Sequence, residues 1–246
     1  MSLALEIKNL SKNFGGVVVT HDLSIAIKPG ERRLIIGPNG AGKTTLFNQI
    51  TGELKPNSGS ISLFGKDISQ LPVHLRARAG ISRTYQIITL FPKNTLAHNV
   101  MLALLGISKR QNEMLKELTT ADELYKKTIR LLDGVGLKDS AEMLVSDIAY
   151  GEQRRVEIAL AMSQEPKVLL LDEPLAGLSK DERLMVRDLI KAIPRSTTIV
   201  MIEHDMDVAL DFAEQISVLH YGRLIVEGAR DEVVNHPRTR EVYLGH

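Results

Sequence analysis

The sequence predicts an α/β protein built on a mixed sheet, and three features of the chain point to that fold class. Short apolar runs rich in Ile, Val and Leu alternate with helical patterns, which suits a central sheet covered by helices on both faces. The first 30 residues instead alternate polar and apolar side chains, as half-exposed antiparallel strands do. Residues from about 90 to 150 contain few strand-like runs, which indicates a helical insertion.

The individual elements follow from these patterns. The apolar runs predict buried strands at residues 33–36, 168–171, 198–202 and 216–219. The alternating segments predict antiparallel strands at residues 5–7, 23–27 and 59–64.

The region without strands predicts a helical subdomain. Thr120 is placed to cap the start of a helix that runs through Leu132, and Gly134 and Gly136 are placed to end it. We therefore expect one domain over residues 1–246, with a core made of residues 1–89 and 150–246 and a helical subdomain at about 90–149.

Composition excludes several classes of protein. The 246 residues include 31 Lys and Arg and 30 Asp and Glu, so the formal net charge is +1 and offers no bulk attraction for nucleic acid. The chain contains no cysteine, which removes disulfides, thiolate metal sites and cysteine nucleophiles. No apolar run reaches the roughly 18 residues that span a bilayer, and the first residues do not resemble a signal peptide. We expect a cytosolic protein.

A glycine-rich loop directly follows the strand at 33–36 and opens a helical pattern. Its spacing fits GxxxxGK[ST], in the strand–loop–helix context that a phosphate-binding loop requires. Backbone N–H groups and the positive helix end bind phosphate oxygens, Lys43 reaches the β- and γ-phosphates, and the Thr44 hydroxyl ligates Mg²⁺. The expected nucleotide-binding residues are Gly37, Pro38, Asn39, Gly40, Ala41, Gly42, Lys43, Thr44 and Thr45. The motif alone leaves NTPase, kinase and GTPase open.

Three other segments supply polar side chains after predicted strands or near them. The strand at 168–171 ends in Asp172, expected to hold Mg²⁺, and Glu173, expected to orient or deprotonate an attacking water. His204 follows the strand at 198–202, from where it can reach the γ-phosphate and position water. Gln86 can bind either Mg²⁺ or the attacking water through its amide oxygen.

Taken in order, these segments resemble the ATPases of ABC transporters. The diagnostic piece is IAYGEQRRV at residues 148–156, which is similar to the family signature LSGGQQQRV and lies just before the acidic strand. The resemblance covers essentially the whole chain. It implies a P-loop NTPase fold of the ABC nucleotide-binding type, ATP and Mg²⁺ as ligands, and ATP hydrolysis. It also implies that Phe14 stacks on adenine and that Lys43, Gln86, Glu173 and His204 act in catalysis.

The resemblance further implies a dimer. The chain has one phosphate loop and one signature, so a complete site needs two chains head to tail. The N-terminus of the signature helix would face the γ-phosphate bound by the other subunit. The residues expected there are Ala149, Tyr150, Gly151, Glu152 and Gln153.

Three positions depart from the family pattern. Ala149 replaces the signature Ser, which removes a hydroxyl from the γ-phosphate and leaves that contact to backbone N–H groups. Tyr150 replaces a Gly and adds bulk near the nucleotide. Ser179 replaces the usual Asp after the acidic strand, although it can still form hydrogen bonds.

Several segments narrow the resemblance to the ATPase subunits of branched-chain (hydrophobic) amino acid importers, a broad group that includes importers of urea and short amides. These are AYGEQRRVEIALAM, EPLAGLS, RTYQ with LFPKNTLAHNV, IEHDMD and EVYLGH. The implied partners are a second ATPase subunit (a copy or a sister chain), membrane permease subunits and, indirectly, a periplasmic or extracellular solute-binding protein. The implied location is the cytoplasmic face of the membrane.

The segment after Gln86, residues 87–100, is the expected permease-docking groove, because Ile87, Leu90 and Phe91 are apolar there. These side chains can alternatively pack internally. Two other functions stay open: the ATPase of a lipid or lipopolysaccharide exporter, and a soluble ABC ATPase without a transport role.

Overall fold

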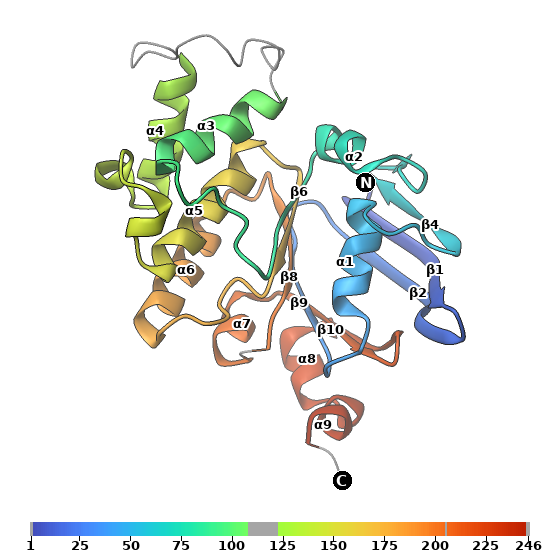
Figure 1. Ribbon diagram of the computed structural model, residues 1–246. Coiled ribbons are helices and arrows are strands. Elements are labelled where there is room, and N and C mark those ends of the chain that lie inside the picture. Colours follow the sequence, from blue (N-terminus) through green and yellow to red (C-terminus); the bar gives the residue numbers. More distant parts are fainter. Residues whose placement is uncertain (1, 108–122, 205, 245–246) are drawn as a thin grey trace.

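A six-stranded sheet forms the centre of the computed structural model, which describes residues 2–107, 123–204 and 206–244 (Figure 1). Its strand order is β10-β9-β3-β8-β7-β6, and all neighbours are parallel except the edge pair β9–β10. The strands are β3 (Arg32–Ile36), β6 (Ile81–Thr84), β7 (Val168–Asp172), β8 (Thr198–Ile202), β9 (Gln215–His220) and β10 (Arg223–Ala229).

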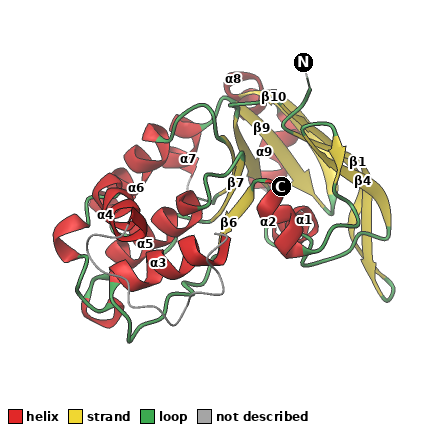
Figure 2. Cartoon of the chain, turned by 90° about the horizontal axis from the view of Figure 1, so that it is seen from above, coloured by secondary structure: helices red, strands yellow, loops and turns green. Residues whose placement is uncertain are grey.

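A four-stranded antiparallel sheet lies beside the central one, as its alternating sequence predicts (Figure 2). Its order is β2-β1-β4-β5, and it consists of β1 (Leu5–Phe14), β2 (Val17–Ile27), β4 (Ser58–Leu63) and β5 (Lys66–Asp67). The first two strands extend well beyond the segments at 5–7 and 23–27 that the sequence predicts, because they pair with each other almost to the hairpin turn.

The helices lie on both sides of the central sheet. Figure 2 shows α3 to α7 on one side and α1 and α2 with the antiparallel sheet on the other. The helices are α1 (Lys43–Thr51), α2 (Val73–Ala79), α3 (Leu96–Ile107), α4 (Glu123–Gly134), α5 (Tyr150–Ser163), α6 (Lys180–Ala192), α7 (Met206–Phe212), α8 (Arg230–Asn235) and α9 (Pro237–Leu244). Short 3₁₀ turns occupy Lys138–Ser140 and Val145–Asp147.

The strand β7 shows why its sequence is apolar throughout. Val168 and Leu170 belong to the core cluster shared with α1 and the antiparallel sheet. Leu169 and Leu171 belong to the cluster on the opposite face, shared with α5, α6 and α7. Successive side chains of a strand point to opposite faces, and both faces of β7 are covered, so its residues are apolar until the strand ends at Asp172.

A third apolar cluster joins α3, α4 and α5. Leu132 is buried in it, as expected for the helix predicted to end near Gly134, and α4 does end at Gly134. Thr120, the predicted cap, lies outside the described residues. The division into a core and a helical subdomain stays a prediction.

Two strands of the central sheet, β6 and β10, are not predicted from the sequence. β6 contains Arg83 between Ser82 and Thr84, and β10 is partly exposed along its length, so neither has the continuous apolar run of a buried strand. Within the described ranges, none of the helices has the length and hydropathy needed to cross a bilayer.

Candidate active site

The predicted phosphate loop joins β3 to α1, and it lines a cavity of about 320 Å³. Gly42, immediately before α1, has φ of 98°, and a β-carbon there would lie 2.6 Å from the backbone oxygen of Val19. Only glycine fits such a left-handed position against neighbouring backbone. The cavity is lined by Val19, Asn39, Gly40, Ala41, Gly42, Lys43, Thr44, Thr45, Gln86, Glu173 and His204. The structure thus brings the loop together with three of the predicted catalytic side chains.

The Lys43 side chain folds back over the loop. Its Nζ donates hydrogen bonds to the carbonyl oxygens of Gly37 at 2.7 Å and Pro38 at 3.1 Å. Burial lowers the pKa of the Lys43 ammonium, while the carboxylates of Glu173 and Asp172 oppose that shift. The two carboxylates therefore favour the charged form of Lys43, and an ammonium at this loop can bind the negative oxygens of a nucleotide.

The acidic pair ends β7 as predicted, but its two members have different surroundings. Asp172 is only 2% exposed and is not among the residues that line the cavity, and burial raises the pKa of its carboxyl. Glu173 has φ of 47°, a left-handed conformation that is rare for residues other than glycine. Its N–H donates to the Ile202 carbonyl, so the adjacent strand β8 holds this turn in place.

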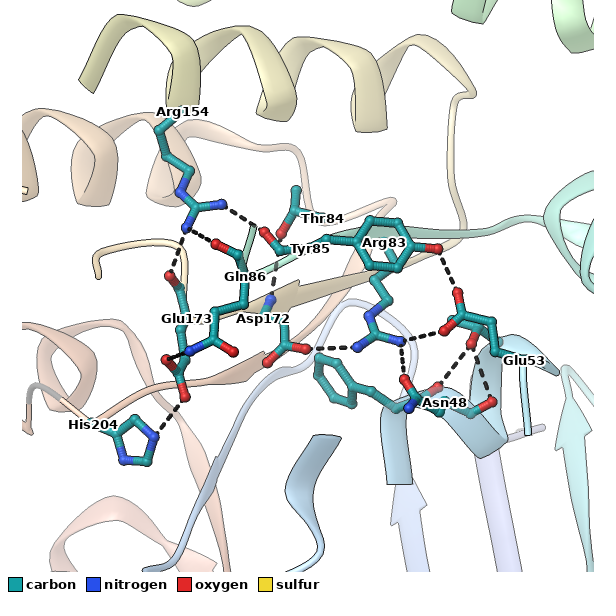
Figure 3. A network of polar contacts seen from close by, with 12 residues as sticks. Asn48, Glu53, Arg83, Thr84, Tyr85, Gln86, Arg154, Asp172, Glu173 and His204 are labelled. Carbon is teal, nitrogen blue, oxygen red and sulfur yellow. Dashed lines mark hydrogen bonds and ion pairs between the residues drawn. The ribbon is translucent and has the colours of Figure 1, made fainter. Parts of the chain in front are cut away.

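Both carboxylate oxygens of Glu173 have a partner inside the site (Figure 3). Gln86 Nε2 donates to Oε2 at 2.8 Å, and His204 Nε2 lies 2.6 Å from Oε1. The three residues follow β6, β7 and β8, which are neighbours in the sheet. The carboxyl ends of adjacent parallel strands therefore place an amide, a carboxylate and an imidazole around one point.

Arg154, on α5, fixes the backbone beneath this group. Its guanidinium donates to the carbonyl oxygens of Tyr85, Gln86 and Glu173 at 2.7, 3.1 and 3.2 Å, and to the carboxylate of Glu157 at 2.7 Å. The side chain is completely buried. Arg154 is not among the site residues predicted from the sequence, although an Arg and a Glu three positions apart on a helix are a known signal for an ion pair.

The magnesium ligands expected from the sequence have suitable chemistry. Asp172 Oδ1 is buried and has no hydrogen-bond partner among the described groups, and Thr44 lines the cavity. Mg²⁺ prefers oxygen ligands and is commonly bound by one or two carboxylates together with substrate phosphates. The side chains present therefore fit the ion.

The signature residues lie apart from this cavity, at the N-terminus of α5. The carboxylate of Glu152 accepts the N–H of Ala149, and Gln153 Nε2 donates to the carbonyls of Val145 and Ile148. Tyr150 is half-exposed, and its ring packs against Gly177. None of these signature residues is among those that line the phosphate cavity of the same chain.

Phe14 also lies outside the cavity lining. It ends β1, with 51% of its surface exposed and the Lys12 ammonium 5.3 Å from its ring centroid. Its stacking on adenine stays a prediction.

Comparison with known proteins agrees with the geometry. Residues 20–176 match the ABC transporter family. The chain is 35% identical over 255 residues to "High-affinity branched-chain amino acid transport ATP-binding protein LivG" of Escherichia coli, covering 98% of this chain and 97% of that protein. It is 34% identical over 248 residues to "Lipopolysaccharide export system ATP-binding protein LptB" of Acidithiobacillus ferridurans, covering 100% and 98%.

Solved structures give the same assignment. The ADP conformation of MJ1267, an ATP-binding cassette of an ABC transporter, superposes with a TM-score of 0.87 at 28% identity and full coverage of both chains. A dimeric post-hydrolysis structure of the cassette MJ0796 with ADP and Pi has a TM-score of 0.79 at 26% identity, covering 92% of this chain and 98% of that one. This chain belongs to the ABC transporter family and is one of its ATP-binding subunits, an ATPase.

Proposed function

We propose that the chain is the Mg²⁺-dependent ATPase subunit of an importer for branched-chain or other hydrophobic amino acids. The observation that carries this proposal is the 35% identity to LivG over nearly the whole of both chains. The cavity supports the ATPase part, because it combines a phosphate loop with a carboxylate, an amide and an imidazole.

Nucleotide binding is assigned to the loop residues 37–45. Backbone N–H groups of the loop and the first turn of α1 bind the phosphate oxygens, and the Lys43 ammonium turns from its own loop carbonyls toward the β- and γ-phosphates. Thr44, Gln86 and Asp172 would hold Mg²⁺, which supplies positive charge against the phosphate oxygens.

Hydrolysis is assigned to Glu173 as the base. Gln86 and His204 each occupy one lone-pair direction of its carboxylate, which orients the group and leaves other lone pairs to accept a proton from the attacking water. His204 and Gln86 then stand beside that water, where each can also contact the γ-phosphate.

The active species is proposed to be a dimer in which ATP closes the two subunits and hydrolysis lets them part. In one chain the signature residues do not reach the phosphate cavity, so a second chain is needed to supply them. The dimeric MJ0796 structure supports this arrangement. The second chain is either a copy or a sister ATPase.

Permease subunits are proposed to dock near residues 87–100, at the cytoplasmic face of the membrane, with a solute-binding protein acting on the other side. Ile87 and Phe91 are 79% and 59% exposed, whereas Leu90 is partly buried against the third apolar cluster. The expected docking surface is therefore Ile87 and Phe91, and Leu90 supports it from beneath.

The 34% identity to LptB favours a second candidate, the ATPase of a lipopolysaccharide exporter. The two functions differ in what stimulates hydrolysis. The chain, its permeases and its solute-binding protein are reconstituted in proteoliposomes, and ATPase activity is measured with leucine, isoleucine and valine or with lipopolysaccharide.

Stimulation by the amino acids, with uptake that depends on ATP, is the expected result. Stimulation by lipopolysaccharide alone would replace the importer with the exporter. Glu173→Gln serves as the control, since it should retain nucleotide in a closed dimer and abolish both turnover and uptake.

A further inference from the structure

Arg83, the third residue of β6, has a buried guanidinium that contacts α1, the turn after α1 and the end of β7 (Figure 3). One terminal nitrogen donates to Asp172 Oδ2 at 2.7 Å, and the other donates to Asn48 Oδ1 at 2.6 Å and Glu53 Oε2 at 3.1 Å. The ring of Tyr85 covers the guanidinium, with its centroid 4.9 Å away, and the Tyr85 hydroxyl donates to Glu53. The side chain of Arg83 is 4% exposed.

Arg83 connects α1 and the end of β7, the two elements that carry the expected magnesium ligands Thr44 and Asp172. Asn48 lies four residues after Thr44 on α1, and residues four apart share one face of a helix. Asp172 ends β7. A planar guanidinium with separate nitrogens on Asn48 and Asp172 therefore sets the position of the Thr44 face of α1 relative to the end of β7.

The contact also gives the two oxygens of the Asp172 carboxylate different roles. Oδ2 accepts the Arg83 hydrogen bond, while Oδ1 is buried without a partner among the described groups. Fixing one oxygen of a carboxylate fixes the direction of the other. The positive charge of Arg83 also offsets the cost of a buried carboxylate before a cation arrives.

We propose that Arg83 is a positioning residue of the magnesium site, which holds Asp172 Oδ2 and Asn48 so that Asp172 Oδ1 and the Thr44 hydroxyl serve the ion together. This inference rests on the proposed magnesium dependence. An arginine with a purely structural role would stabilise the fold equally, but it would not change how much the cation strengthens nucleotide binding.

The test is the ratio of two dissociation constants for N-methylanthraniloyl-ADP, one measured in EDTA and one with Mg²⁺, by fluorescence. In the unaltered chain the ratio should exceed one. Arg83→Met should bring that ratio toward one, a decrease of up to about tenfold, since residues that orient metal ligands typically contribute 10- to 100-fold to metal affinity. The affinity in EDTA should change by no more than about twofold, because the loop and Lys43 are unaltered.

Two further variants separate positioning from charge and from stability. Arg83→Lys keeps the charge, but one ammonium cannot replace two separate nitrogens, so its ratio should stay well below that of the unaltered chain. Arg33→Met is the matched control. Arg33 is equally buried, pairs with Glu31 at 2.6 Å, and lines a different cavity, so its loss should lower the thermal midpoint without changing the ratio.

The outcomes separate the two proposals. If the unaltered chain binds equally well in EDTA and Mg²⁺, the magnesium site and the role of Arg83 both fall. If the unaltered chain shows the preference and Arg83→Met shows the same or a larger one, the role of Arg83 alone is overturned. A ratio for Arg83→Lys equal to that of the unaltered chain would also overturn the bridging role.

Discussion

The carboxylate of Glu182, in the first turn of α6, lies directly against Gly151 in the first turn of α5: a β-carbon on Gly151 would come within 2.2 Å of Glu182 Oε1. The same carboxylate accepts hydrogen bonds from the Ser179 N–H at 2.8 Å and the Ser179 hydroxyl at 2.7 Å. These bonds, with a smaller one from the Gly151 N–H, lower the pKa of the Glu182 carboxyl. The Glu182 carboxylate thus accepts hydrogen bonds at the N-terminus of α6 and at the N-terminus of α5.

Gly151→Ala should consequently have an effect that depends on Glu182. Alanine favours a helix over glycine by up to about 1 kcal/mol, so the substitution should stabilise a chain that already carries Glu182→Ala. In the unaltered background the new methyl displaces the carboxylate from Ser179, and most of that gain should disappear. Urea unfolding of the four variants measures the difference, and equal effects in both backgrounds would contradict the contact.

Ser179→Asp should destabilise the chain, even though Asp is as good a helix cap as Ser. The Ser179 hydroxyl donates to Glu182, whereas an Asp carboxylate cannot donate and repels the second negative charge. The loss should shrink as the pH falls below about 4, where carboxyl groups become protonated. Adding Glu182→Gln should restore stability at neutral pH, and its failure to do so would contradict this account of why Ser replaces the family's Asp here.

Gly40→Ala and Gly42→Ala form a matched pair in the phosphate loop. Both glycines have positive φ, 79° and 98°, so either alanine costs about 1–2 kcal/mol in backbone strain. A β-carbon at Gly40 meets nothing within 4 Å, but at Gly42 it lies 2.6 Å from the Val19 carbonyl oxygen. Gly42→Ala should lower the free energy of unfolding more than Gly40→Ala in nucleotide-free protein, measured by urea titration. Equal losses would contradict the close contact at Gly42, because they would mean that the backbone around Val19 moves aside without lowering the free energy of unfolding.

Arg154→Met should destabilise the chain in a pH-dependent way. Removing one member of a buried ion pair typically costs about 3–5 kcal/mol, and Arg154 and Glu157 are 0% and 6% exposed. Burial raises the pKa of the Glu157 carboxyl, and the charge of Arg154 opposes that rise. Between the ordinary value of 4.5 and the raised folded value, the folded chain retains a proton that the unfolded chain has lost, so the free energy of unfolding falls as pH rises through this window.

Without Arg154 the window reaches a higher pH. The variant should therefore lose more stability at about pH 8 than at about pH 5, as measured by urea unfolding at both values. Glu157→Gln is the control, because the double variant has no carboxyl to titrate and should show the same loss at both pH values. A loss in the single variant that does not depend on pH would mean that Glu157 is not the group affected.

The sequence predicts the fold best where burial alone decides which residues are allowed. Strands that are covered on both faces are mostly apolar, which is why β8 lies over the predicted residues 198–202 and β7 differs from its prediction by a single residue. β10 is partly exposed, and β6 is largely buried but contains Ser82, Arg83 and Thr84, so neither forms the apolar run that would predict a strand. Likewise the order of Lys43, Glu173 and His204 along the chain indicates the site, because each follows a strand of the same sheet.

The contacts of Arg83 and Arg154 could not be predicted in the same way. Each arginine binds groups from several elements far apart in the sequence, and nothing local to Arg83 says that Asn48 and Asp172 will lie on either side of it. Such bridging depends on how the elements pack, which only the three-dimensional structure provides.

The Lys43 ammonium bonded to the carbonyls of Gly37 and Pro38 has a consequence for how nucleotide affinity should be understood. Binding is partly an exchange of one set of oxygens for another, because two of the three N–H donors of the lysine already bond to carbonyl oxygens before phosphate arrives. The Lys43 ammonium holds the phosphate loop in its curled shape before nucleotide binds, so the loop backbone loses little conformational freedom on binding. Measured affinity is then the difference between two good sets of partners, and a change in either set alters it.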